Sequence, residues 1–197
     1  MQNAAGRMQT LIQDLLQLSR VTSRAQPFQP CDLGRIAADV VSDLEVSIEQ
    51  SGGKLEIGEL PTIEADPLQM RQLFQNLIAN ALKFHKPNET PIVRIHSEQL
   101  SATDFSVPGA RPPDRIVRIT VEDNGIGFDP KFADQIFVVF QRLHTKTEYE
   151  GTGIGLAVCR KITDRHGGTI VAQSAEGRGA TFVITLPVKQ PNAPENL

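Results

Sequence analysis

Residues 1–22 carry apolar side chains at alternating steps of three and four positions. This spacing places them along one side of a single helix, as in a coiled coil or a helix bundle. Further apolar positions widen the stripe, which favours a bundle of several helices over a two-stranded coil. Because the stripe would face water on an isolated helix, we expect it to pack against another chain or another segment. It consists of Met1, Ala4, Met8, Leu11, Leu15 and Leu18, widened by Ala5, Ile12 and Leu16.

The pattern after this helix predicts a series of shorter helices and strands. Two prolines in residues 25–30 prevent a helix from continuing, so we interpret this segment as a linker. Asp32 is a typical N-cap residue for a helix that reaches about residue 50. The remaining pattern predicts helices at about 67–85 and 154–166, and strands near 54–57, 62–65, 91–100, 115–122, 168–174 and 180–187.

Together these segments predict an α+β fold. Hairpin-linked strands mixed with helices form a two-layer sandwich when the helices cover one face of a mixed, mainly antiparallel sheet. We therefore expect one long helix over residues 1–24, a linker over 25–30, a domain over 31–188 and a disordered tail over 189–197.

Composition narrows the class of protein. With 40% hydrophobic and 22% charged residues, the chain resembles an ordinary globular protein. Its net charge of -3 and its lack of a basic run argue against nucleic-acid binding. No apolar run reaches the roughly 20 residues of a membrane helix, so we expect no direct membrane contact and a cytoplasmic location, with any anchor elsewhere in a longer parent protein. Cys31 and Cys159 fit no metal or redox spacing, which predicts two reduced, buried or half-buried thiols.

The predicted helix at 67–85 carries a second, polar side. Asn76, Asn80 and Lys83 lie four and three residues apart, so they follow one another along that side. Each asparagine lowers helix stability by roughly half a kcal/mol relative to alanine, which suggests another use. Amide oxygens are suitable ligands for Mg²⁺, and an ammonium group suits phosphate oxygens. The alternative is a polar face that simply contacts water.

The predicted strand before residue 123 ends in an acidic side chain. Asp123 has the same parity as the apolar residues of this strand, so its carboxylate is expected to point toward the core. A charge there needs a partner, and the amino group of a ligand such as adenine would supply one. Gly125 and Gly127 follow and allow the backbone to approach a ligand closely. The alternative is an Asx turn that ends the strand.

A second glycine-rich segment runs directly into a predicted helix. Gly151, Gly153 and Gly155 alternate with other residues and expose backbone amides beside the helix N-terminus, an arrangement that binds anions. The segment contains no Walker motif and follows no strand, so it is not a Rossmann fingerprint. A flexible hinge is the alternative.

These motifs, in this order and spacing, resemble the catalytic domains of sensor histidine kinases. That family belongs to the GHKL superfamily, with gyrase-type, mismatch-repair and heat-shock-chaperone ATPases, which share the Bergerat ATP-binding fold. The resemblance covers roughly residues 30–188, and the segment around residues 140–149 is similar to kinases linked to phytochrome or PAS sensors. Asn76–Phe84 resembles the N box, Asp123–Gly127 the G1 box, Ile136–Arg142 the F box and Gly151–Leu156 the G2 box.

The resemblance implies a role for each motif residue, with ATP and Mg²⁺ as cofactors. Asn80 would bind Mg²⁺ with support from Asn76, and Lys83 would contact phosphate oxygens. Phe84 would pack beside the nucleotide, and Asp123 would accept from the adenine amine, helped by Thr181 through water. Arg142 would reach the γ-phosphate from a mobile lid over about 128–150. Asn76, Lys83 and Arg142 are the candidate catalytic residues; Phe137 and Phe140 would be hydrophobic docking points; Gly125, Gly127, Gly151, Thr152, Gly153, Ile154, Gly155 and Leu156 would contribute to nucleotide binding.

The N-terminal helix is similar to the second helix of a dimerisation and phosphotransfer hairpin. The first helix of such a hairpin, with its acceptor histidine, is absent, and we interpret all four histidines as surface or loop residues. The resemblance implies transfer of the γ-phosphoryl group from MgATP to a supplied acceptor histidine, relay to a response-regulator receiver domain, and a homodimeric parent. The alternatives are an ATPase and a nucleotide-binding module without turnover. The ATPase is disfavoured because Asn76 stands where the gyrase and chaperone relatives have a water-activating glutamate.

Overall fold

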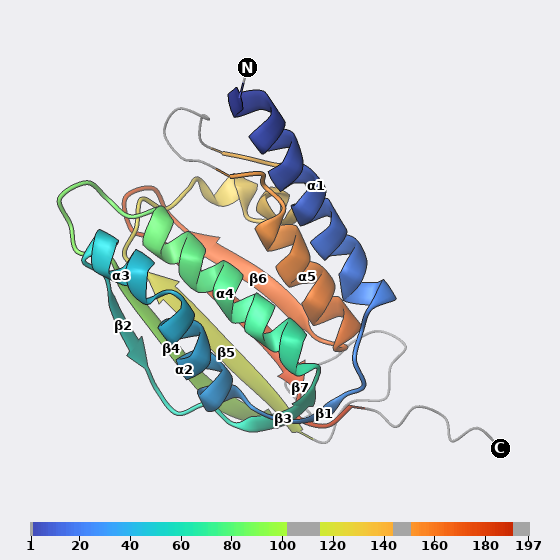
Figure 1. Cartoon of the computed structure of the whole chain (residues 1–197). Helices are drawn as coiled ribbons and strands as arrows, with labels where there is room; N and C mark the ends of the chain where they lie inside the picture. Colours follow the sequence, from blue (N-terminus) through green and yellow to red (C-terminus); the bar gives the residue numbers. More distant parts are fainter. Residues whose placement is uncertain (1, 102–114, 144–150, 191–197) are drawn as a thin grey trace.

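The computed structural model describes residues 2–101, 115–143 and 151–190, with the two-layer architecture drawn in Figure 1. A five-stranded sheet has the order β2-β4-β5-β7-β6. Strand β2 runs parallel to β4, whereas every other neighbouring pair is antiparallel. The expected mixed, mainly antiparallel sheet is therefore confirmed. The strands are β2 (Lys54–Ile57), β4 (Ile92–Ser101), β5 (Arg115–Asp123), β6 (Thr169–Ser174) and β7 (Ala180–Pro187).

Helices cover one face of this sheet. Figure 1 shows α2, α4 and α5 lying across that face, with α1 alongside α5. The predicted α+β sandwich preceded by a long helix is confirmed. The helices are α1 (Gln2–Ser23), α2 (Leu33–Asp43), α3 (Glu45–Ser51), α4 (Pro67–Lys83) and α5 (Gly155–Arg165).

The central helix, α4, shows how local sequence and packing agree. Asp66 caps its N-terminus by accepting hydrogen bonds from the amides of Leu68 and Gln69, and Pro67 occupies the first turn. The apolar stripe is almost completely excluded from water, because it packs against the inner face of the sheet. Burial of such side chains stabilises the fold by about 1.5–3 kcal/mol each. The stripe consists of Leu73, Phe74, Leu77, Ile78, Ala81 and Leu82.

Two segments between α1 and α4 differ from the sequence prediction. The helix expected from Asp32 to about residue 50 begins at that cap but is interrupted at Leu44, which separates α2 from α3. In addition, part of the expected linker forms strand β1 (Gln29–Asp32), which pairs antiparallel with β3 (Thr62–Ala65). This small sheet has only two strands, so Pro30 occupies an edge strand, where proline is tolerated.

The C-terminal tail also begins later than expected. The backbone amide of Gln190 donates to the Glu64 carboxylate, and its side-chain amide donates to the carbonyls of Glu64 and His166. Residues 189 and 190 thus belong to the folded body. The rest of the expected tail, residues 191–197, and the proline-rich loop at 107–113 lie outside the described residues.

Helix α1 packs through its C-terminal end. Val21 is buried and Leu18 is half-buried against the core. Farther up the helix, four apolar side chains are between 37% and 56% exposed: Leu11, Ile12, Leu15 and Leu16. Within the described ranges, no helix has the length and apolar character needed to cross a membrane.

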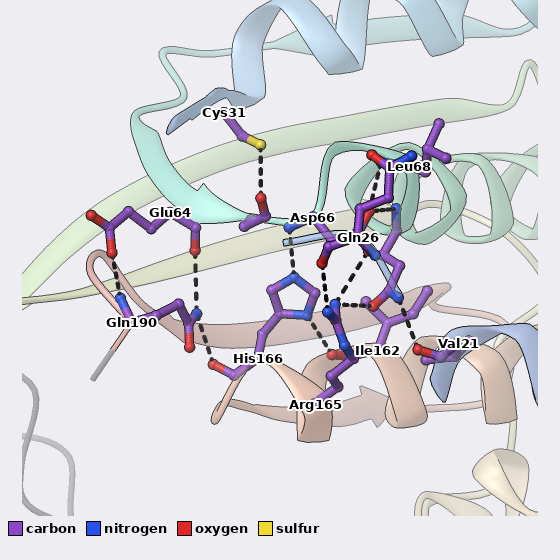
Figure 2. Close-up of polar contacts among 12 residues, drawn as sticks. Val21, Gln26, Cys31, Glu64, Asp66, Leu68, Ile162, Arg165, His166 and Gln190 are labelled. Carbon is purple, nitrogen blue, oxygen red and sulfur yellow. Dashed lines mark hydrogen bonds and ion pairs between the residues drawn. The ribbon is translucent and has the colours of Figure 1, made fainter. Parts of the chain in front are cut away.

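A cluster of polar residues, some buried and some exposed, joins the end of α1 to the body (Figure 2). Asp66 accepts hydrogen bonds from the amide of Gln26 and from Nη1 of Arg165. Arg165 also donates to Oε1 of Gln69 and to the carbonyl of Gln26, while Gln69 donates to the carbonyl of Val21. We call Gln26, Asp66, Gln69, Arg165 and His166 the polar joint. It ties the chain after α1 to the N-terminus of α4 and the C-terminus of α5.

The position of His166 in this joint corrects one expectation. We expected every histidine at the surface or in a loop, but His166 is completely buried. Its Nε2 accepts from the amide of Asp66, and its Nδ1 bonds to the carbonyl of Ile162. Burial lowers the pKa of His166, and the charge of Arg165 lowers it further, so the neutral ring is favoured. His96 is exposed as expected, His85 is half-buried, and His144 lies outside the described residues.

Candidate functional site

A cavity of about 310 Å³ lies where α4 ends and α5 begins. The C-terminal end of β5 and the start of β7 complete its walls. Its size is within the range of small-molecule binding sites, roughly 300–1,000 Å³. The lining residues are Asn80, Lys83, Phe84, Asp123, Ile126, Gly127, Phe128, Ile136, Gln141, Arg142, Leu143, Gly151, Thr152, Gly153, Gly155, Leu156, Ala180 and Phe182.

Asp123 lies at one end of the cavity, with its carboxylate half-buried as the strand parity predicts. Its Oδ1 accepts from the amides of Gly125, at 2.8 Å, and Ala180, at 3.1 Å. The first bond is the Asx turn of the alternative interpretation, so that turn exists and the carboxylate lines the cavity as well. Burial raises the pKa of Asp123, and the two backbone hydrogen bonds oppose this shift. Among the described residues nothing donates to Oδ2, which leaves an acceptor for a ligand.

Glycines allow the backbone around Asp123 to pack closely. A Cβ at Gly125 would lie 2.3 Å from the carbonyl oxygen of Phe84, and one at Gly127 would lie 2.1 Å from that of Ala175. Gly179, which immediately precedes β7, would place a Cβ 1.9 Å from the carbonyl oxygen of Asp123. These contacts are too short for any side chain, so the wall that holds Asp123 depends on glycine at these positions.

The last turn of α4 brings an amide and an ammonium group to the cavity. Asn80 and Lys83 both line it, and Nζ of Lys83 lies 4.6 Å from the centre of the Phe84 ring. Phe84 caps the helix, and its carbonyl accepts from the amide of Ile126. This bond fixes the end of α4 against the turn that follows β5.

The glycine loop borders the opposite wall. Gly151 and Gly153 have φ angles of 145° and 76°, which only glycine adopts readily. A Cβ at Gly151 would lie 2.8 Å from Nζ of Lys83, so the loop passes directly beside the ammonium group. Ile154 provides no side-chain cap for α5 in the described structure, so the amides of its first turn are available to an anion.

Four of the expected binding residues lie outside the cavity lining. The Asn76 side chain donates a hydrogen bond to α5 instead, and Ile154 is buried in the core. Gly125 acts through the turn that supports Asp123. Thr181 alternates with Ala180 and Phe182 along β7, and because only those two line the cavity, Thr181 faces the other side of the sheet.

Most of the apolar wall of the cavity was not predicted from the sequence. In β7 the signal was present, because Ala180 and Phe182 have the parity of the buried residues Ile184 and Leu186. The missed lining residues are Ile126, Phe128, Ile136, Gln141, Leu143, Ala180 and Phe182.

The two candidate docking phenylalanines have different environments. Phe137 is buried between Phe182, whose ring centre lies 6.4 Å away, and the guanidinium group of Arg160, so it is a core residue and not a docking point. Phe140 is 55% exposed and has a positive φ of 66°. The described part of the expected lid, residues 128–143, contains two short 3-10 turns, Pro130–Phe132 and Gln135–Phe137.

Among the residues that the structure describes, metal-binding side chains of the usual kinds do not gather at the cavity. Across the described ranges, no group of three or more His, Cys, Asp or Glu residues could hold a metal ion. Cys31 and Cys159 are free and buried, as expected. Asn80 lines the cavity, and its amide oxygen is a suitable ligand for a hard cation.

Comparison of the sequence with known proteins identifies the family. Residues 65–190 match the family described as histidine kinase-, DNA gyrase B-, and HSP90-like ATPases. The chain is 44% identical over 181 residues to cyanobacterial phytochrome A of Nostoc sp. (strain PCC 7120). It is 41% identical over 181 residues to the phytochrome-like protein Cph1 of Synechocystis sp. (strain PCC 6803). Each alignment covers 92% of this chain and 22% of the relative, so the chain spans about a fifth of their length.

Solved structures agree with this match. The catalytic domain of histidine kinase ThkA has a TM-score of 0.65 and 27% identity, over 83% of this chain and 97% of that domain. The resemblance to sensor histidine kinases is thus confirmed. Since the family match covers more than half of a chain that also has the expected fold and cavity, the chain belongs to the histidine kinase-, DNA gyrase B-, and HSP90-like ATPase family.

Proposed function

We propose that this chain is the catalytic part of a protein-histidine kinase, which transfers the γ-phosphoryl group of ATP to a histidine. The observation that carries the proposal is the cavity itself. One end offers the half-buried carboxylate of Asp123, which has an open acceptor, and the other offers Lys83 beside a glycine loop at the start of α5. A ligand with an amino group at one end and several negative charges at the other fits both ends.

The two ends correspond to the two parts of ATP. Asp123 would accept from the adenine amine, while the apolar wall that includes Ile126 and Phe182 would surround the ring. Lys83, Arg142 and the amides of residues 151–156 would hold the phosphates. Asn80 would contribute its amide oxygen to Mg²⁺, which neutralises phosphate charge during transfer. Because the imidazole of the acceptor is itself the nucleophile, the cavity requires no base that activates water.

The acceptor would be a histidine on a helical hairpin. We propose that α1 is the second helix of that hairpin in a homodimeric parent, because Leu11, Ile12, Leu15 and Leu16 leave an apolar stripe exposed. Histidine kinase ThkA has been solved in complex with the response regulator protein TrrA. We propose by analogy that the phosphoryl group passes on to a receiver domain. We also place the domain in the cytoplasm, where ATP is available and free thiols stay reduced.

Labelled ATP tests this function directly. The chain is incubated with γ-labelled ATP and Mg²⁺, alone and with the two-helix hairpin of a similar kinase. A hairpin whose acceptor histidine is replaced by glutamine serves as the matched control. We expect label on the intact hairpin only, in an acid-labile and alkali-stable form.

The other outcomes distinguish the alternatives. Fast release of phosphate without a hairpin would identify an ATPase instead. Tight ATP binding with neither labelling nor release, across hairpins from several relatives, would leave a nucleotide-binding module. Label on the chain alone would contradict the expectation that the acceptor must be supplied.

A further inference from the structure

The side chain of Asn76 bridges two helices and does not enter the cavity. Its Nδ2 donates to the backbone carbonyl of Gly155 in α5, at 3.1 Å. Its Oδ1 accepts from Nε2 of Gln72, one turn earlier in α4, at 3.0 Å. If the amide were rotated by half a turn, its oxygen would face the Gly155 carbonyl, which also only accepts. The two partners therefore determine which way the amide points.

This orientation bears on metal binding. The amide oxygen is the atom of an asparagine that binds a hard cation. In Asn76 that oxygen is directed to Gln72, and Asn76 does not line the cavity. Asn80, one turn later on the same helix, does line it. The two asparagines of α4 are therefore placed for different tasks.

The partner of Asn76, Gly155, lies where the glycine loop meets α5. Gly155 is the first residue of α5, ends the glycine loop and lines the cavity. A Cβ there would lie 3.7 Å from Cγ of Asn76, an ordinary contact, so the two residues are packed together without strain. One turn farther, the thiol of Cys159 is fully buried, which raises its pKa to about 12, and the nearby Asn76 amide opposes this rise. Asn76 thus packs against the first two turns of α5.

We propose that Asn76 is a positioning residue, which holds the first turn of α5, and with it the glycine loop, in the shape that receives the phosphates of ATP. The role rests on the proposed function, since it requires that phosphates bind at this loop. A residue that acts in this way affects phosphate binding whether or not Mg²⁺ is present. A metal ligand affects it only with Mg²⁺.

Calorimetry on the whole 197-residue chain separates these roles. Wild type, Asn76→Ala and Asn80→Ala are titrated with ATP plus Mg²⁺, with ATP plus EDTA, and with adenosine. For Asn76→Ala we expect ATP affinity to fall about three- to tenfold under both ATP conditions, the effect of one lost hydrogen bond. Adenosine affinity should stay within about twofold of wild type, because its site at Asp123 is unchanged. The matched variant, Asn80→Ala, should lose ATP affinity only in the presence of Mg²⁺.

A second variant tests the orientation of the amide. Gln72→Leu removes the donor to Oδ1 without touching Asn76 or the cavity, so we expect the same pattern with a smaller loss. The role is refuted if Asn76→Ala weakens ATP only with Mg²⁺, has no effect, or weakens adenosine equally. If wild type binds neither ATP nor adenosine, the proposed function fails, and this role fails with it.

Discussion

Two glycines of the hairpin between β6 and β7 allow the packing around Asp123 to be tested. Both Gly177 and Gly179 have positive φ angles, 74° and 80°. A Cβ at Gly177 would meet nothing within 4 Å, whereas one at Gly179 would lie 1.9 Å from the carbonyl oxygen of Asp123. The same substitution at the two positions therefore differs in one physical respect, the steric contact with β5.

The structure gives the size of this difference. Alanine at a positive φ costs about 1–2 kcal/mol, so Gly177→Ala should lower the free energy of unfolding by about that amount. Gly179→Ala has the same backbone cost, but the strands must also separate by about 1.5 Å to reach an ordinary contact, which adds about 1–3 kcal/mol of overpacking. We therefore expect a total loss of about 2–5 kcal/mol.

Urea unfolding of the three proteins measures both values. Because the displaced carbonyl belongs to Asp123, Gly179→Ala should also weaken adenosine binding at temperatures where the variant is folded. Equal losses of stability for the two alanine variants would refute the steric argument. Unchanged adenosine affinity in Gly179→Ala would refute the link between this contact and the placement of Asp123.

Three further predictions concern buried charge. Asp123→Asn should raise the free energy of unfolding of the ligand-free chain near neutral pH. Burial raises the pKa of Asp123, so ionisation of the wild-type carboxyl opposes folding as pH rises above 3.8. The same variant should bind adenosine about tenfold more weakly, or worse. Burial lowers the pKa of His166, so the folded chain should lose stability as pH falls below 6.5. In NMR spectra the His166 ring should titrate below its ordinary value of 6.5. Arg165→Met leaves the buried Asp66 without its cation and should lower the free energy of unfolding by about 2–4 kcal/mol, measured in urea.

Each of these has an outcome that contradicts it. The stability gain of Asp123→Asn should vanish in acid, where the wild-type carboxyl is protonated; a gain that persists there points to another cause. A His166 ring that titrates at or above 6.5 would contradict its burial. Arg165→Met should also speed amide hydrogen exchange at Gln26, and unchanged exchange would mean that the arginine does not fix this segment.

The sequence predicts the larger elements because their patterns are long. The apolar stripe of α4 and the apolar-rich segment of β5 extend over several turns or residues, and both elements are confirmed. Strand β1 has only four residues, one of them Pro30, so it carries no usable periodicity. It forms because β3, which lies 30 to 36 residues later in the chain, pairs with it.

In the candidate site, too, local features could be predicted from the sequence, whereas contacts between distant segments could not. The inward direction of Asp123 follows from strand parity, a local property, and is confirmed. The partner of Asn76 depends on where α5 crosses α4, and the burial of His166 depends on Asp66, 100 positions earlier. Such contacts between distant segments are set by tertiary packing, and no single-sequence pattern encodes them.

The polar joint and the cavity occupy opposite ends of the same two helices. With 17 residues, α4 is about 25 Å long, so a change in its direction near Asp66 is magnified at its other end. A tilt of about 5° there moves the far end by about 2 Å, enough to break a hydrogen bond. By holding the other ends of α4 and α5 together, the polar joint therefore limits the separation of Asn80 and Gly155 across the cavity. None of the residues of the polar joint lines the cavity.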